Sequence, residues 1–188
     1  MGRRLLTISN LIAGYREPMV GPVSLTVRAG ERLGITGPNG CGKSTLLRVL
    51  AGEARAFAGR IAYAPGVHAV CQAQDGLRTG EIPLNVMDCL HLTSDSPLPL
   101  PERLRGTERQ RLDALSGGQR QLLAVWMALS APRQLLLLDE PTNNMDPAGR
   151  EDLIRALTDL PAHRGALIVS HEQALLEAVC QRIENIGG

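Results

Sequence analysis

Short apolar segments and segments of alternating apolar and polar residues, separated by turn residues, recur along the chain and predict a succession of strands and helices. The pattern predicts strands at 4–11, 23–28, 31–36, 135–138 and 166–169. It predicts helices at 43–50, 84–92, 116–130, 147–160 and 172–181. The leucine run at 135–138 is typical of a strand that is covered on both faces of a parallel sheet. This alternation of strands and helices predicts an α/β fold.

Two stretches that contain proline interrupt this pattern. The segments 60–64 and 67–73 have the character of short strands, and Pro65-Gly66 between them predicts a hairpin turn. In the stretch 96–101, prolines alternate with other residues. Because proline lacks a backbone donor and fixes φ, this stretch cannot form the interior of a regular helix. We expect it to interrupt the chain within a small subdomain.

Length and composition exclude several classes of protein. A chain of 188 residues, 44% of them hydrophobic, is long enough to fold as one domain with its own core. The longest apolar run, 122–129, is too short to cross a membrane. The formal net charge of +1 argues against a basic surface, so we expect no direct contact with nucleic acid. The four cysteines form no C-x-x-C pair, which argues against a zinc site and a disulfide scaffold.

The segment 37–44 matches the phosphate-loop pattern G-x-x-x-x-G-K-[ST] and lies between a predicted strand and a predicted helix. Its glycines allow backbone N–H groups to surround phosphate oxygens, and the following helix directs its N-terminus at the same phosphates. Lys43 is expected to reach the β- and γ-phosphates, and Ser44 to bind Mg²⁺. The residues expected to contact the nucleotide are Gly37, Pro38, Asn39, Gly40, Cys41, Gly42, Lys43, Ser44 and Thr45.

Lys43 is also the single lysine of the chain, since the other nineteen basic residues are arginines. A planar guanidinium is bulkier than an ammonium group and does not replace it inside a tight phosphate cradle. The lysine at this position therefore indicates a chemical requirement, and a coincidence of composition is the alternative interpretation.

A second group of candidate residues follows the apolar run 135–138. Asp139 and Glu140 come directly after it, and in a parallel sheet the C-terminal ends of the strands line the ligand crevice. Asp139 is expected to hold Mg²⁺, directly or through water, and Glu140 to polarise an attacking water molecule. The alternative interpretation is a strand that ends at an exposed acidic turn. The presence of a phosphate loop in the same chain argues against this alternative.

Between these two groups lies Leu115-Ser116-Gly117-Gly118-Gln119, here called the signature segment. With it, the chain resembles the ATP-binding-cassette (ABC) ATPase family over nearly its whole length. The segment opens the predicted helix 116–130, which creates a second N-terminal anion site. The resemblance implies that Ser116, Gly117, Gly118 and Gln119 bind the γ-phosphate held by a second cassette. An ordinary helix cap with flexible glycines is the alternative.

The resemblance assigns roles to further residues. Tyr15 corresponds to an aromatic residue that stacks on adenine, and His171 to the switch histidine that contacts the γ-phosphate. Asp146 lies in the D-loop (143–146), which contacts the opposite site, and it is also a good N-cap for the next helix. The family's glutamine that binds Mg²⁺ is assigned to Gln74, with Gln72 as the second choice. The residues expected to carry catalysis are then Lys43, Glu140 and His171.

The resemblance also implies a fold. It predicts one domain over 1–188, with a P-loop NTPase (RecA-like) core around a parallel sheet and an N-terminal antiparallel β subdomain. A helical subdomain is expected as an insert at 88–130, and its part between Asp88 and Leu115 is short. In transporters the membrane subunits dock beside this subdomain, so its small size weakens the expectation of such docking.

The function implied by the resemblance is ATP hydrolysis, with ATP and Mg²⁺ as cofactors and no other metal. Two cassettes, most simply a homodimer, are expected to bind ATP head to tail and to drive transport through separate membrane-spanning subunits. The protein would then lie in the cytoplasm, peripherally on the inner face of the cell membrane. The stretch 74–88 faintly resembles importers of metal cations. The alternative is a soluble, non-transport cassette acting on ribosomes, because 140–146 resembles translation-associated members.

Overall fold

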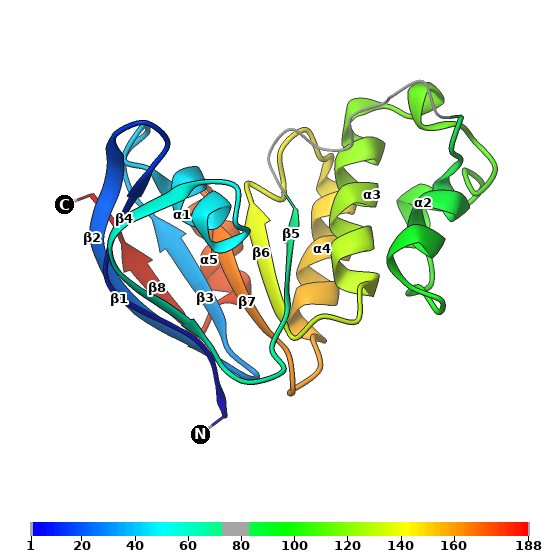
Figure 1. The fold of residues 1–188 in the computed structure, drawn as a ribbon. Coiled ribbons are helices and arrows are strands. Elements are labelled where there is room, and N and C mark those ends of the chain that lie inside the picture. The colour runs from blue at the N-terminus through cyan, green and yellow to red at the C-terminus, as the bar shows by residue number, and fades with distance from the viewer. Residues whose placement is uncertain (1, 73–82, 188) are drawn as a thin grey trace.

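The computed structural model describes residues 2–72 and 83–187, and two sheets dominate it (Figure 1). A five-stranded parallel sheet has the order β5-β6-β7-β3-β8, and a three-stranded antiparallel sheet has the order β2-β1-β4. The parallel strands are β3 (Arg32–Thr36), β5 (Ala69–Gln72), β6 (Leu135–Asp139), β7 (Gly165–Val169) and β8 (Arg182–Asn185). The antiparallel strands are β1 (Arg4–Gly14), β2 (Pro18–Arg28) and β4 (Arg55–Tyr63). The two sheets confirm the predicted α/β fold and its N-terminal antiparallel part.

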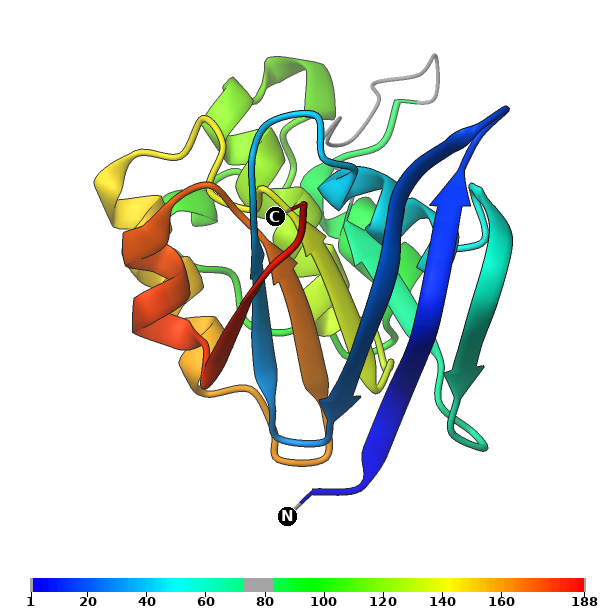
Figure 2. The same ribbon diagram turned by 90° about the vertical axis from the view of Figure 1, so that its left-hand side faces the viewer.

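The helices form two layers around the parallel sheet (Figures 1 and 2). Helix α1 (Lys43–Leu50) contacts β1, β2 and β6 and therefore lies between the two sheets. The opposite face is covered by α3 (Gly117–Ser130), α4 (Pro147–Thr158) and α5 (Gln173–Val179). Within the part of the chain that the structure describes, no helix is long and apolar enough to cross a membrane.

Strand β6 shows how the sheet divides the core. Leu135 and Leu137 pack in the cluster that contains α1 and the antiparallel sheet, whereas Leu136 and Leu138 pack in the cluster under α3, α4 and α5. All four side chains are completely buried. Successive side chains of a strand point to opposite faces, so a strand between two helical layers must be apolar at every position.

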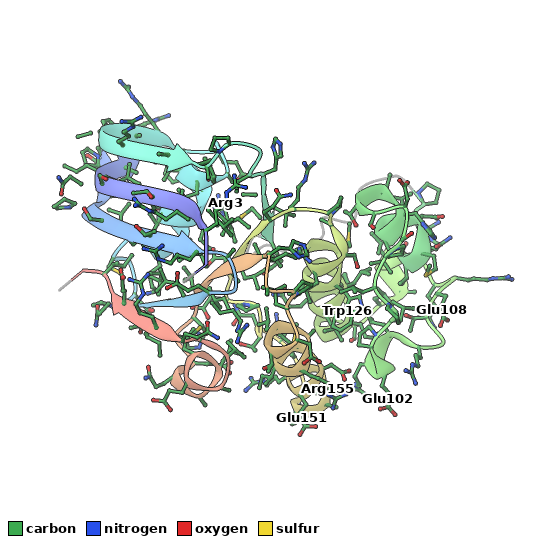
Figure 3. The ribbon with its side chains drawn as sticks, turned by 90° about the horizontal axis from the view of Figure 1, so that it is seen from below. Arg3, Glu102, Glu108, Trp126, Glu151 and Arg155 are labelled. Carbon is green, nitrogen blue, oxygen red and sulfur yellow. The ribbon has the colours of Figure 1, made fainter. Side chains whose placement is uncertain are left out.

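The insert between β5 and α3 contains α2 (Val86–Thr93) and two short 3₁₀ turns, η1 (Glu102–Leu104) and η2 (Leu112–Ala114). The proline-containing stretch 96–101 forms no helix, as expected. It is held against α3, because Trp126 Nε1 donates to the carbonyl of Pro99 and Leu98 N donates to Ser130 Oγ. This stretch, Trp126 of α3 and Arg155 of α4 line a groove of about 410 Å³. Figure 3 labels both of these side chains in a view from below.

The predicted hairpin at 60–66 is wrong. Strand β4 pairs antiparallel with β1, whereas β5 pairs parallel with β6, so the two segments belong to different sheets. Pro65-Gly66 still makes a turn, and Gly66 has a φ of 73°, which favours glycine. The turn redirects the chain from one sheet to the other instead of folding it back on itself.

Candidate active site

The candidate residues gather where the parallel strands end. The phosphate loop follows β3, Asp139 ends β6, and His171 comes just after β7. A cavity of about 450 Å³ opens at this edge. It is lined by Met19, Asn39, Gly40, Gly42, Lys43, Ser44, Thr45, Glu140, Asn143 and His171. The structure therefore brings the predicted phosphate-loop and catalytic residues together at one site.

Gly42 at the start of α1 must be a glycine for two reasons. Its φ is 92°, which L side chains rarely adopt, and a Cβ atom here would lie 2.5 Å from Cβ of Val20. Gly42 is also the N-cap of α1 and gives that helix no side-chain cap. The N–H groups of the first turn are consequently left to a ligand at the loop, which is the arrangement that binds phosphate.

The ammonium group of Lys43 lies inside the phosphate loop. Lys43 is buried, and its Nζ donates to the carbonyl of Gly37 at 2.8 Å and to that of Pro38 at 2.7 Å. These carbonyls carry no net charge, whereas phosphate oxygens would add the Coulombic attraction of an ion pair to the ammonium. Phosphate oxygens at the loop would therefore compete successfully with these neutral carbonyls for the ammonium.

Asp139 offers the site an unsatisfied carboxylate. The residue is 2% exposed, and its Oδ1 has no hydrogen-bond partner, while Ser44 forms a hydrogen bond with the carboxylate. Burial raises the pKa of Asp139, and the negative charge of Glu140 raises it further, against the opposing effect of the Ser44 bond. A buried carboxylate oxygen beside a serine hydroxyl is a donor set that suits Mg²⁺.

Glu140 has an unusual backbone and a well-defined carboxylate. Its φ is 47°, a left-handed conformation that is uncommon for residues other than glycine and that persists where the surroundings impose it. The carboxylate accepts hydrogen bonds from the backbone N–H of His171 at 3.1 Å and from Ser170 Oγ at 3.2 Å. His171 Nδ1 lies 2.8 Å from Oε2 of Glu140. The acidic side chain is thus held at the edge of the cavity by the segment that follows β7.

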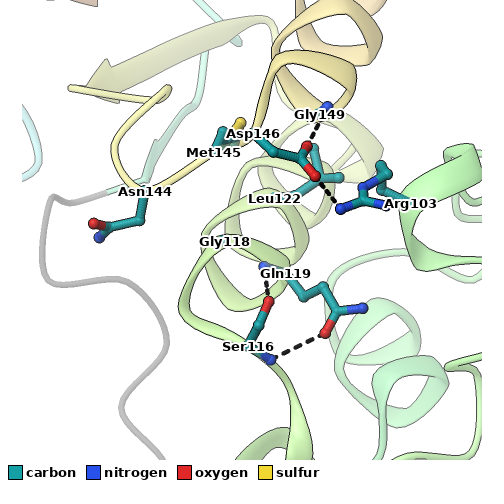
Figure 4. Close-up of a pocket in the computed structure, with 9 residues that line it drawn as sticks. All are labelled: Arg103, Ser116, Gly118, Gln119, Leu122, Asn144, Met145, Asp146 and Gly149. Atoms are coloured by element: carbon teal, nitrogen blue, oxygen red, sulfur yellow. Dashed lines mark hydrogen bonds and ion pairs between the residues drawn. The ribbon is translucent and has the colours of Figure 1, made fainter.

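The signature segment forms a separate site in this chain (Figure 4). Ser116 Oγ accepts a hydrogen bond from Gln119 N, and Gln119 Oε1 accepts one from Ser116 N, which is a capping box at the start of α3. A cavity of about 250 Å³ adjoins this helix end. It is lined by Arg103, Ser116, Gly118, Gln119, Leu122, Asn144, Met145, Asp146 and Gly149. These residues are not brought to the phosphate cavity of their own chain.

Sequence comparisons with known proteins point to the same kind of site. A family model described as "ABC transporter" matches residues 20–82, and one described as "AAA domain, putative AbiEii toxin, Type IV TA system" matches 101–177. The zinc import ATP-binding protein ZnuC of Cereibacter sphaeroides is 37% identical, over 89% of this chain and 72% of that protein. The ZnuC of Marinobacter nauticus is 36% identical, over 89% of this chain and 68% of that protein. The chain belongs to the ABC transporter ATP-binding family.

Other similar proteins share only part of their length or only their fold with this ABC ATPase. The "Probable ATP-binding protein YheS" of Escherichia coli K12 is 35% identical over 93% of this chain, which covers 28% of YheS. A solved ATP-binding subunit of an ABC transporter has a TM-score of 0.83 at 22% identity, covering 97% of this chain and 85% of its own. As a member of this family, the chain binds and hydrolyses ATP.

The D-loop of this ABC ATPase contains the N-cap of α4. Asp146 Oδ1 accepts a hydrogen bond from Gly149 N at 2.9 Å, which confirms the predicted cap. Its other carboxylate oxygen accepts from the guanidinium of Arg103 on η1 (Figure 4). Asp146 therefore joins the D-loop to the helical insert, and its predicted contact with a nucleotide remains a prediction.

Of three further site residues, Tyr15 and Cys41 do not line the phosphate cavity, and Gln74 is not among the described residues. Tyr15 lies in the turn between β1 and β2, is 44% exposed and does not line the phosphate cavity. Cys41 lies against Gly187 near the C-terminus. A Cβ atom added to Gly187 would lie 2.6 Å from the Cβ of Cys41. Gln74 falls outside the described residues, while Gln72 is buried at the end of β5, in register with Leu138.

Three residues in or beside the phosphate cavity were not assigned there from the sequence. Met19, from the hairpin that carries Tyr15, and Asn143 of the D-loop both line the phosphate cavity. Gln121, on α3, is 5% exposed and donates to backbone carbonyls beside the active site. The one signal for Gln121 is its place as a polar residue at the start of the apolar run 122–129.

Proposed function

We propose that this ABC ATPase is the ATP-hydrolysing subunit of a transporter that imports a divalent metal cation, with zinc as the first candidate. The observation that carries this proposal is the continuous similarity, over nine tenths of the chain, to zinc import ATP-binding proteins from several bacteria. A match over this share of the chain extends well beyond the phosphate loop.

For the chemistry, we assign the phosphates to the N-terminus of α1 and to Lys43. Ser44 and Asp139 are the residues that would hold Mg²⁺, because a buried oxygen of Asp139 lacks any other partner. When bound, Mg²⁺ offsets negative charge on the phosphates. Glu140 orients the attacking water and accepts its proton, and His171 contacts the γ-phosphate. Catalysis of phosphoryl transfer then consists of positioning and electrostatic stabilisation by these groups.

The complete site requires a second cassette in this proposal. The signature segment lies in a cavity of its own and opens a fourteen-residue helix whose N-terminus favours an anion. In a head-to-tail dimer, Ser116 and Gly118 of one copy would contact the γ-phosphate held by Lys43 of the other. Closure around ATP and opening after hydrolysis would be the mechanical output.

Separate membrane-spanning subunits are the partners that this function requires, and they would hold the ATPase at the cytoplasmic face of the membrane. The helical insert offers them an apolar contact, because Leu92 on α2 is 70% exposed.

The test is affinity purification of the Glu140→Gln variant from detergent-solubilised cells with ATP and Mg²⁺, because loss of hydrolysis should preserve the ATP-bound complex. Recovery of a multi-spanning membrane protein, together with loss of zinc uptake when the gene is deleted, is the expected result. Lys43→Ala, which should not bind ATP, is the matched control. Ribosomal proteins without a membrane subunit would contradict this proposal and support the soluble cassette suggested by the stretch 140–146.

A further inference from the structure

Gln121 connects the signature helix to the backbone of the proposed catalytic base. It lies in the second turn of α3 and is 5% exposed. Its side-chain Nε2 donates to the carbonyls of Glu140 and Pro141, both at 3.3 Å. An amide carries two N–H groups, so one buried side chain can serve both acceptors.

The backbone that Gln121 holds is the one that aims the carboxylate of Glu140. With a φ of 47°, Glu140 needs its surroundings to maintain its conformation. Its N–H donates to Val169 O at 2.9 Å, and its carbonyl accepts from Asn143 N at 3.1 Å. The hydrogen bond from Gln121 is a third restraint on the Glu140 backbone, and it comes from α3, on the other side of the turn. A small rotation of this backbone would move the carboxylate away from the phosphates.

A second contact fixes the same helix to the following D-loop. A Cβ atom on Gly118 would lie 2.5 Å from the carbonyl oxygen of Asn144, so the loop runs directly against the first turn of α3. Met145, the next residue, is buried in the same cluster as Leu122 of α3. The start of α3 and the stretch 140–146 are therefore packed as one unit.

We infer that Gln121 is a positioning residue for ATP hydrolysis, acting through Glu140. Its amide holds the strained turn in the orientation that directs the carboxylate into the phosphate cavity. The signature segment lies at the start of α3, so contact with ATP bound to a second copy would shift this helix. The two hydrogen bonds from Gln121 would pass that shift to Glu140 of the same chain. The inference rests on the proposed assignment of Glu140.

The test compares Gln121→Met with Ser130→Ala. Methionine keeps the length of the side chain and removes both donors. Ser130 is also buried, at the opposite end of α3, where its Oγ accepts a hydrogen bond from Leu98 N. For Gln121→Met we expect kcat to fall at least tenfold, with MgATP affinity changed less than twofold. For Ser130→Ala we expect a kcat within twofold of wild type, even if its melting temperature falls as much as that of Gln121→Met.

A double-mutant comparison separates positioning from general damage. If Gln121 acts through Glu140, then Gln121→Met should not lower the residual single-turnover rate of Glu140→Gln any further, because residues that act as a unit are not additive. A kcat equal to that of wild type in Gln121→Met would overturn the inference. It would also be overturned if Gln121→Met lowered the rate by the same factor in wild type and in Glu140→Gln. If Gln121→Met does not fold, Gln121→Leu removes the donors with an apolar side chain that is shorter than methionine, and it carries the same expectation. Full activity of Glu140→Gln alone would instead refute the assignment of Glu140.

Discussion

His171 contacts Glu140 twice: its ring Nδ1 lies 2.8 Å from Oε2, and its backbone N–H donates to the same carboxylate. The backbone bond fixes the carboxylate whatever the ring does. The ring is more than half exposed, so it can turn toward a phosphate at the cavity. Oε2 of Glu140 also accepts from Ser170 Oγ. A γ-phosphate that takes over the ring contact would remove one of its partners and leave room for Oε2 to accept a proton from water.

This relationship predicts the effect of removing the ring. His171→Ala should lower kcat by about 10²–10³-fold, the range for loss of one donor to a developing charge. MgATP binding should persist, because Lys43 and the N-terminus of α1 are unchanged. The measurement is steady-state phosphate release alongside nucleotide titration. His163→Ala is the control, since His163 is exposed on the loop before β7, and equal losses in both variants would refute the role of His171.

The two glycines of the signature segment should respond differently to alanine. A Cβ atom on Gly118 would meet Asn144 O at 2.5 Å, whereas one on Gly117 would meet nothing within 4 Å. Gly118→Ala should therefore lower the free energy of unfolding by about 1–3 kcal/mol through overpacking. Gly117→Ala should leave it unchanged or slightly higher, since alanine favours the helix. Urea unfolding without nucleotide measures both, and equal stabilities would contradict the packing described here.

Asp139 predicts a stability effect that depends on pH. Burial raises its pKa, so above that raised pKa the ionised carboxylate destabilises the folded state. Asp139→Asn should consequently raise the melting temperature at pH 7.5 without Mg²⁺. The gain should disappear as the pH falls below the ordinary aspartate pKa of about 3.9, where the carboxyl is protonated in both the folded and the unfolded state. Thermal unfolding across this range is the measurement, and a lower melting temperature for the variant at pH 7.5 would contradict the assignment.

Arg164 should be important for stability. Its buried guanidinium donates to the carbonyls of Ala128, Leu129, Ala131 and Arg133, which end α3 and begin the turn after it. Burial lowers its pKa, but the group remains charged, as arginine does in proteins.

Replacement by methionine should lower the free energy of unfolding by about 3 kcal/mol or more, because hydrogen bonds to charged groups contribute about 1.5–3 kcal/mol each. The exposed Arg133 provides the control, and Arg133→Met should change stability by less than about 0.5 kcal/mol. Denaturant unfolding measures the stability of both variants. If Arg164→Met were as stable as wild type, these hydrogen bonds would contribute little to the free energy of unfolding.

Elements defined by local chemistry could be predicted from the sequence. Helix α1 has the predicted bounds, because a phosphate loop leads directly into a helix. Asp146 caps α4 as expected, since the capping interaction spans only three residues. Ser116 caps α3 in the same way, which the sequence allowed only as the alternative interpretation of the signature segment. The phosphate loop, Asp139 and Glu140 were placed at one edge of the sheet by the rule for parallel strands, and the structure places them there.

Features that depend on distant partners could not be predicted. The strand character of 60–64 and 67–73 was clear, but the sheet that each joins depends on β1 and β6 elsewhere in the chain. Strand β8 was missed because none of its four residues is buried, so it carries no apolar run. Gln121 was missed because its acceptors lie about twenty residues away and meet it only through tertiary packing.

The most direct test of the central claim, that this chain hydrolyses ATP with Glu140 as the base, uses two purified proteins. Phosphate release and MgATP binding are measured on the same preparations of wild type and Glu140→Gln. We predict turnover by wild type, a loss of about 10²–10⁴-fold in the variant, and equal nucleotide affinity in both. Equal turnover by the two proteins would contradict the role of Glu140, and failure of wild type to bind MgATP would contradict the site itself.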